Sequence, residues 1–330
     1  MIKLTLREIV QAVTGATGAD VPLTSVTGVS TDTRQVAAGE LFVALRGERF
    51  DGHDYVGAAL ERGAVGAVVA TARLGALRTG LGPEAAGRLI GVDDPLAAYG
   101  RLAHYHRQQL PAQVIAVAGS NGKTTTKAMI AHVLSARWRG RASPKSFNNA
   151  IGVPYTLLSA DARDDYVVVE IGTNAPGEVD ALARLTRPDL GVITSLGEEH
   201  LEGLGDLEGV AAEECALLAH LRNGFAAVNV DRPLIRRHLP ADGLTVVTFG
   251  AEPDADLRVD AVEYAAPWLR FRVNERSAYR LPMPGRHNAV NALGAIAIAR
   301  RLGWDHGEIA ARLESFAPPP MRCELVTQGG

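Results

Sequence analysis

The segment with the clearest chemical potential is a glycine-rich turn that follows an apolar stretch and opens a segment with helical spacing. Glycines at such a turn let backbone N–H groups point inward around an anion, and a helix start adds positive potential. The pattern predicts a phosphate-binding loop. In it Lys123 reaches the β- and γ-phosphates of a nucleoside triphosphate, and Thr124 offers its hydroxyl to Mg²⁺. The expected phosphate site comprises Gly119, Ser120, Asn121, Gly122, Lys123, Thr124 and Thr125.

This loop departs from the usual GxxxxGK[ST] pattern, because Val117 stands where the first glycine belongs. The loop indicates that a nucleotide binds but does not say which reaction takes place.

Candidate metal ligands follow two later strands. Glu170 ends the apolar run from Tyr166, at the strand end where open α/β sheets bind ligands, and Mg²⁺ prefers oxygen ligands. His200 follows the next strand and could bind a metal or a phosphate oxygen. An exposed acid and a solvated histidine are the alternatives.

Two further segments carry paired amide side chains. Asn148 and Asn149 lie in a polar loop marked by glycine and proline, where they either cap turns or present hydrogen-bonding groups to a polar substrate. Asn288 lies at the start of a helix and suits an N-cap. Asn291 lies one helical turn further on and could face the same site as Asn288.

The elements that must position these residues change character at Pro111, which is a plausible domain boundary. Before it we expect a helix at 54–62, a buried strand at 64–70 and a helix at 96–110. After it we expect strands at 113–118, 166–171, 190–194, 225–230 and 244–249, and helices at 125–137, 177–185, 206–221 and 233–238. Residues 256–280 alternate like a small antiparallel sheet, and helices follow at 288–302 and 306–316. Strands that alternate with helices favour an α/β fold with a mostly parallel sheet covered by helices.

Composition restricts the class of protein. The 330 residues suit two domains, and the formal net charge of −3, without any basic run, argues against a nucleic-acid partner. No signal-peptide core and no apolar run long enough to span a membrane are present, so we expect a cytoplasmic protein. Two widely separated cysteines are typical of reduced thiols in that compartment.

Taken together, the motifs resemble those of the Mur ligases, which extend the peptide of bacterial peptidoglycan. The 119–125 loop resembles the family's ATP loop and Val169–Glu178 its metal-binding glutamate segment. Gly197–Gly203 resembles its histidine segment and Gly285–Leu293 its adenine-contacting helix. The segments Ser30–Arg34 and Leu41–Asp54 favour the member that adds D-alanyl-D-alanine to UDP-N-acetylmuramoyl-tripeptide. The resemblance covers essentially the whole chain.

The resemblance implies an ATP- and Mg²⁺-dependent amide ligase that works through an acyl phosphate and releases ADP and phosphate. The family's fold implies a small N-terminal α/β domain at 1–108, which binds the UDP end of the substrate, and a central ATP-binding domain at 109–319. Residues 320–330 then begin a hinge to a C-terminal domain that is absent from this chain, so we expect the chain alone to be weakly active or inactive. We also expect a monomer.

The family pattern assigns the following roles by resemblance. The catalytic residues are Lys123, Glu170, His200 and Glu214. The metal ligands are Thr124, Glu170, His200 and Glu214. Asn288 and Asn291 contact the adenine, and Arg322 reaches the nucleotide. The residues that bind the other substrates are Ser30, Thr31, Asp32, Arg34, Asn148, Asn149, Thr173 and Asn174.

Two residue positions depart from the family pattern. Relatives commonly carry a carbamylated lysine in the helix after the histidine segment, where this chain has Glu214. We expect Glu214, or its neighbour Glu213, to supply that negative charge. Many relatives also show Gly-Asn where this chain has Lys145 and Ser146, so the resemblance assigns no role to Ser146.

Three alternatives stay open at this stage. A sister Mur ligase or a folylpolyglutamate-type ligase shares the ATP loop. A non-catalytic fragment that binds nucleotide or UDP-sugar-peptide fits a chain without the third domain. A P-loop GTPase is a more distant alternative, because the chain has no Asn-Lys-x-Asp segment to read guanine.

Overall fold

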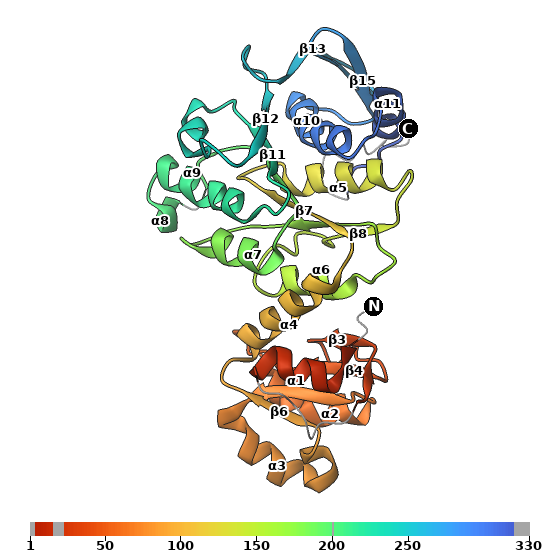
Figure 1. The fold of residues 1–330 in the computed structure, drawn as a ribbon, viewed down its shortest axis with the longest axis vertical. Helices are drawn as coiled ribbons and strands as arrows, with labels where there is room; N and C mark the ends of the chain where they lie inside the picture. Colours follow the sequence, from red (N-terminus) through yellow and green to blue (C-terminus); the bar gives the residue numbers. More distant parts are fainter. Residues whose placement is uncertain (1–3, 16–22, 200, 320–330) are drawn as a thin grey trace, which may run out of the picture. The chain divides into compact units, whose positions relative to one another are not determined.

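The computed structural model describes residues 4–15, 23–199 and 201–319, and Figure 1 shows their fold. The polypeptide forms two compact units. The first comprises residues 1–110 and 150–162, and the second comprises 111–149 and 163–330. The predicted functional division at residue 108 stays a prediction. The structure adds that a short segment from beyond that point, 150–162, groups with the first unit.

The first unit is built on a four-stranded parallel sheet in the order β3-β4-β5-β6. Its elements are β1 (Leu4–Thr5), α1 (Leu6–Thr14), β2 (Ser25–Val26), β3 (Gly28–Ser30), β4 (Glu40–Val43), η1 (Gly52–Tyr55), α2 (Val56–Glu61), β5 (Gly66–Ala70), α3 (Thr71–Ala86), β6 (Leu89–Val92), α4 (Pro95–Gln109) and α6 (Gly152–Ser159). A capping box between Thr5 and Glu8 starts α1, and Asp94 caps α4. Helices α1 and α4 pack together, and α4 also packs against α6.

The second unit is built on a nine-stranded sheet in the order β15-β14-β13-β12-β11-β10-β7-β9-β8. Its strands are β7 (Gln113–Ala118), β8 (Gly140–Ala142), β9 (Tyr166–Glu170), β10 (Leu190–Ile193), β11 (Phe225–Asn229), β12 (Thr245–Gly250), β13 (Leu257–Ala265), β14 (Trp268–Val273) and β15 (Ser277–Leu281). Strands β8 to β12 and β7 pair in parallel, and β13, β14 and β15 pair antiparallel. The predicted fold class, a mostly parallel sheet with a small antiparallel part, is therefore confirmed.

Helices cover both faces of this sheet (Figure 1). They are α5 (Lys123–Leu134), α7 (Glu178–Thr186), α8 (Leu201–Leu204), α9 (Leu207–Cys215), η2 (Ala216–His220), η3 (Pro233–His238), α10 (Arg286–Arg301) and α11 (His306–Glu314). Neighbouring residues of a strand point to opposite faces. Accordingly, Val192 packs in a core with α5, α10 and α11, whereas Ile193 packs in a separate core with α9, η2 and η3.

Several boundaries differ from the expected ones for local reasons. Helix α5 begins at Lys123 rather than at residue 125, because Gly122 takes a left-handed conformation directly before it. The long helix expected at 206–221 is divided into α9 and the 3₁₀ segment η2. Asn288 is not an N-cap, since α10 begins at Arg286 with Gly285 before it.

Candidate active site

The turn between β7 and α5 has room for backbone but not for additional side-chain atoms. Gly119 and Gly122 have φ angles of 114° and 87°, a region that favours glycine. A Cβ atom at Gly119 would lie 2.5 Å from the hydroxyl of Thr194, and one at Gly122 would collide with the amide oxygen of Asn291. The two glycines therefore let the turn pack closely against the end of β10 and the start of α10.

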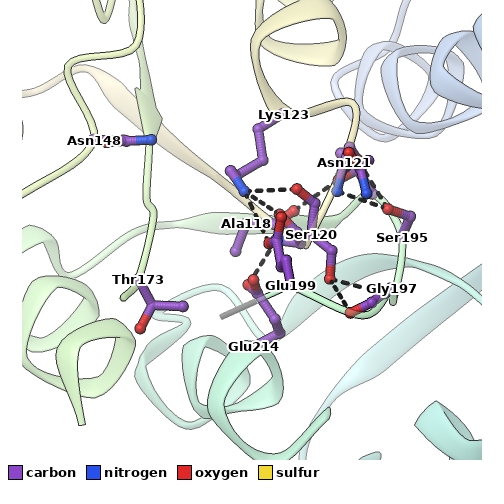
Figure 2. A network of polar contacts seen from close by, with 12 residues as sticks. Ala118, Ser120, Asn121, Lys123, Asn148, Thr173, Ser195, Gly197, Glu199 and Glu214 are labelled. Carbon is purple, nitrogen blue, oxygen red and sulfur yellow. Dashed lines mark hydrogen bonds and ion pairs between the residues drawn. The ribbon is translucent and has the colours of Figure 1, made fainter. Parts of the chain in front are cut away.

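Hydrogen bonds fix the turn on the segment that follows β10 (Figure 2). The hydroxyl of Thr194 donates to the carbonyl of Asn121 at 2.6 Å, and the Asn121 N–H donates to the Ser195 hydroxyl at 2.9 Å. The Ser120 hydroxyl accepts from the N–H of Gly197 at 2.9 Å. The turn is thus held in shape by the protein itself, as a pre-organised anion site requires.

Lys123 bends back over this turn. Its ammonium group donates to the carbonyls of Gly119 and Ser120, the latter at 3.0 Å, and lies 3.6 Å from the carboxylate of Glu199 (Figure 2). Its side chain is largely buried. A phosphate group at the turn would offer the ammonium group a stronger partner than these two carbonyls.

The carboxylate of Glu170, at the end of β9, is the point where three segments meet. It accepts from the hydroxyl of Thr124 at 3.0 Å, from the side-chain amide of Asn148 at 3.2 Å and from the ammonium group of Lys127 at 2.8 Å. The Glu170 side chain is only 1% exposed. The structure thus brings three predicted site residues together and adds a lysine that the sequence reasoning did not consider.

Glu214, on α9, lies at the other end of the turn. One carboxylate oxygen accepts from the Gly119 N–H at 2.6 Å, and the other is buried without a hydrogen-bond partner among the residues that the structure describes. Burial raises the pKa of Glu214 to about 7, although nearby Lys123 and the Gly119 N–H oppose the rise. A carboxyl group that changes charge near neutral pH therefore touches the phosphate turn.

Its neighbour Glu213 has a different surrounding. The Glu213 carboxylate accepts from the N–H groups of Gly177 and Val179, at 2.7 and 2.8 Å, and from the hydroxyl of Thr173 at 3.2 Å. These bonds satisfy backbone groups at the start of α7. Of the two glutamates named from the sequence, Glu214 is thus the one that contacts the turn, and Glu213 holds α7.

A cavity of about 960 Å³ opens beside the turn. On one side it is lined by residues of the turn, with Glu170 and Asn148, and on the other by the start of α10. Asn288 and Asn291 both line it and are joined by a hydrogen bond of 3.1 Å. The lining also includes three residues that the sequence reasoning missed, Asn229, Asp231 and Arg232. Their position at the end of an apolar strand, or directly after it, was the available signal, since ligands bind at such ends.

Other predicted residues lie elsewhere or outside the described ranges. Thr173 donates to the Ala175 carbonyl, and the N–H of Asn174 donates to Glu178, and neither residue lines the cavity. Asn149 follows Asn148 but does not line the cavity. His200 and Arg322 lie outside the described residues.

The predicted UDP-site residues belong to the first unit. Thr31, Asp32 and Arg34 line a cavity of about 710 Å³, together with Arg46 and other residues of the 45–55 segment. Ser30 does not line it, but its hydroxyl accepts from the N–H of Asp32 at 3.2 Å. The Arg34 guanidinium donates to both carboxylate oxygens of Asp32 and lowers the pKa of Asp32 to about 2. This cavity therefore carries an exposed cation with a fixed carboxylate beside it.

The oxygen groups around Glu170 and Thr124 suit Mg²⁺, which binds through one or two protein oxygens plus the phosphates of a nucleotide. Within the described ranges, no three His, Cys, Asp or Glu side chains converge on a metal position. No helix in the described part of the chain has the length and apolar character needed to cross a membrane.

Comparisons with known proteins define the class. The chain matches the catalytic-domain model of the Mur ligase family over residues 25–107 and the Mur ligase middle-domain model over residues 117–299. The chain therefore belongs to the Mur ligase family.

Among its relatives is the UDP-N-acetylmuramoyl-tripeptide–D-alanyl-D-alanine ligase of Bacillus subtilis. The two are 36% identical over 329 residues, which cover 99% of this chain and 70% of the relative. The ligase of the same name from Escherichia coli is also 36% identical, over 98% of this chain and 70% of its own length.

Solved structures show the same fold. A MurF structure from Acinetobacter baumannii matches with a TM-score of 0.86 at 28% identity, over 99% of this chain and 71% of that chain. The MurF ligase of Thermotoga maritima, solved in complex with ADP, matches with a TM-score of 0.75 at 23% identity, over 87% and 66% of the two chains, and supports the fold alone.

Proposed function

We propose that this chain belongs to an ATP-dependent ligase that joins D-alanyl-D-alanine to UDP-N-acetylmuramoyl-tripeptide. The observation that carries the proposal is the single cavity lined by the phosphate turn, Lys123, Thr124 and Glu170. The names of the relatives that match nearly the whole chain supply the substrates. The cavity supports a reaction between two anions, because it gathers the cationic and N–H groups that such a reaction needs.

The ATP phosphates bind to the backbone N–H groups at the start of α5, and Lys123 leaves the Gly119 and Ser120 carbonyls to contact the β- and γ-phosphates. Thr124 and Glu170 would hold Mg²⁺, and the metal would neutralise charge on the phosphates. Asn288 and Asn291, on the far wall of the cavity, contact the adenine. The role assigned to Arg322 at the nucleotide stays a prediction.

The reaction then needs positioning more than protein nucleophiles. A carboxylate oxygen of the tripeptide attacks the γ-phosphorus and ADP leaves, which gives an acyl phosphate. The amine of D-alanyl-D-alanine attacks the acyl carbon, loses a proton and displaces phosphate, so that an amide remains. Lys123 stabilises the charge that develops on the transferred phosphoryl group, and Asn148 presents its amide toward the carboxylate substrate.

Glu214 supplies a negative group at the end of the turn once its carboxyl group, whose pKa is about 7, has lost its proton. It keeps the Gly119 N–H oriented, and its second oxygen provides the charge that relatives draw from a carbamylated lysine. His200 is assigned to the same side of the site by resemblance. In the first unit, Thr31, Asp32 and Arg34 bind the UDP end of the sugar-peptide. A cytoplasmic location and a monomeric state stay predictions.

The test is turnover by the full product of the gene. With MgATP and UDP-N-acetylmuramoyl-tripeptide, we expect multiple-turnover phosphate release that requires D-alanyl-D-alanine. Release that requires a free amino acid instead would identify a sister ligase or a folylpolyglutamate-type enzyme. If both substrates bind but no phosphate is released with any combination of substrates, the protein is a binding module and the proposal is wrong.

A further inference from the structure

Lys127 is a buried lysine inside a helix. It lies one turn along α5 from Lys123, and its side chain is only 4% exposed. Lysine is rarely buried unless its ammonium group has polar partners. Here the ammonium group has two, the Glu170 carboxylate at 2.8 Å and the carbonyl oxygen of Lys145. The side chain thus joins α5 to two other segments of the second unit.

The first partner is the carboxylate assigned above to the metal. A buried ion pair gains about as much from attraction as it loses in desolvation, so it is weak evidence of stabilisation. Such a pair does fix the orientation of the two side chains. Lys127 binds one oxygen of Glu170, Asn148 binds the other, and Thr124 approaches both. The orientation of the Glu170 carboxylate is therefore determined by three donors.

The second partner lies in a strained backbone. Lys145 has a φ angle of 48°, in the left-handed region that non-glycine residues rarely adopt. Its own side chain is exposed and does not bury itself against the protein. The bond from Lys127 to its carbonyl is therefore a contact that holds this conformation in place.

The strained residue lies within a loop, 143–149, that is bound to Glu170 at two further points. The Glu170 N–H donates to the hydroxyl of Ser143 at 3.0 Å, and Asn148 donates to the carboxylate. Ser146 and Asn148 of the same loop line the cavity. Glu170, Lys127 and the loop thus form one connected network beside the cavity.

We propose that Lys127 is a positioning residue that clamps the 143–149 loop to the Glu170 carboxylate, so that the cavity-facing loop and the metal-binding carboxylate are held as one unit. The structural part of the proposal stands on these contacts, and its catalytic part rests on the proposed ligase function. The loop faces the cavity with Ser146 and Asn148, so the clamp sets where the carboxylate substrate lies relative to the nucleotide.

The structural test is hydrogen–deuterium exchange of the chain without nucleotide or metal. Lys127→Met removes both bonds of the ammonium group at nearly constant shape. We expect backbone amides of residues 145–149 to exchange about tenfold faster, while those of residues 128–134 in α5 keep their rates. Lys145→Ala is the matched control, because it removes an exposed side chain and leaves the carbonyl, and it should keep the slow exchange.

A second variant covers the case in which Lys127→Met alone does not fold. The double variant Lys127→Met/Glu170→Gln removes both buried charges together, which spares the core an unpaired carboxylate. It too should show fast exchange at 145–149. Wild-type exchange rates in this loop, in a folded Lys127→Met chain or in the folded double variant, would overturn the proposal.

The catalytic test uses the full gene product. For Lys127→Met we expect the KM for UDP-N-acetylmuramoyl-tripeptide to rise about tenfold. The Kd for MgATP should rise by a smaller factor, because Glu170 loses one of its three donors while Lys123 and Thr124 stay in place. A purely structural lysine predicts equal losses for both ligands, and that result would refute the positioning role. If the unmodified protein shows no turnover, the ligase function fails, but the exchange experiment still decides whether the clamp exists.

Discussion

The buried carboxyl group of Glu214 leads to the most quantitative prediction. Its pKa is about 7 in the folded chain against an ordinary 4.5, and desolvation is the main cause. Between these pH values the folded chain keeps a proton that the unfolded chain releases, so the free energy of unfolding falls as pH rises through this window. Above pH 7 the full cost of the buried charge is present.

The magnitude follows from the shift. About 2.5 pKa units at 1.36 kcal/mol each correspond to about 3 kcal/mol. Glu214→Gln removes the charge and keeps an oxygen that can accept from the Gly119 N–H. Its new NH₂ group replaces the oxygen that has no hydrogen-bond partner among the described residues, which costs about 1 kcal/mol. We therefore expect the unliganded variant to be about 2 kcal/mol more stable than wild type at pH 8.5.

The assay is urea unfolding followed by tryptophan fluorescence at pH 5 and pH 8.5. The chain has three tryptophans, Trp138, Trp268 and Trp304, and all lie in the unit that contains Glu214. Near pH 5 the variant should lose its higher free energy of unfolding, since wild-type Glu214 is then protonated in the folded chain. Under the proposed function, the stabilised variant should also bind MgATP more weakly, because the carboxylate that the resemblance assigns to the metal is gone.

Glu213→Gln is the matched control at the adjacent position. Glu213 accepts from two backbone N–H groups and a hydroxyl, and the NH₂ of a glutamine would face a donor there. This variant should be destabilised by about 1–3 kcal/mol at pH 8.5, the opposite sign. If Glu214→Gln were instead less stable than wild type at pH 8.5, or if its gain were equal at both pH values, the reasoning about the buried charge would be wrong.

Three further predictions concern the turn and the first unit. Lys123→Met should raise the Kd for MgATP at least about tenfold in calorimetry, because the phosphates lose their ammonium partner, and an unchanged Kd would contradict its role. Gly122→Ala should lower the free energy of unfolding by about 1–3 kcal/mol in urea titrations, since a Cβ meets Asn291 and φ is 87°. A neutral effect would mean that the turn relaxes freely. Burial lowers the pKa of His106, whose ring donates to the Ala160 carbonyl, so stability should fall as pH drops below 6.5, and His106→Gln should weaken that dependence in thermal melts. An identical pH profile for the variant would count against this.

The parts of the structure that could be predicted from the sequence are those with local signals. An apolar run, a glycine turn and a helical period predicted β7, the turn and α5, and the strand-end position of Glu170 followed from the same kind of pattern. The fold class followed because buried strands and helices alternate in the sequence. Each of these features is encoded within a few residues.

The relationships that could not be predicted join residues far apart in the chain. Glu214 binds the N–H of Gly119, 95 residues away, and Lys127 pairs with Glu170 across 43 residues. Periodicity carries no information on such pairs, because it reports which face of an element is buried and not what the element packs against. Helix α6 was missed for a related reason, since its short apolar stretch lacks a polar face.

The polypeptide crosses between its two compact units three times, after residues 110, 149 and 162. No single cut can therefore divide the gene into two intact parts. A fragment that ends at residue 110 keeps His106 in α4 but loses α6 and the Ala160 carbonyl that its ring binds, while the complementary fragment carries α6 without that partner. To express the second unit alone, residues 150–162 must be replaced by a linker from residue 149 to residue 163, and the first unit alone needs that segment restored.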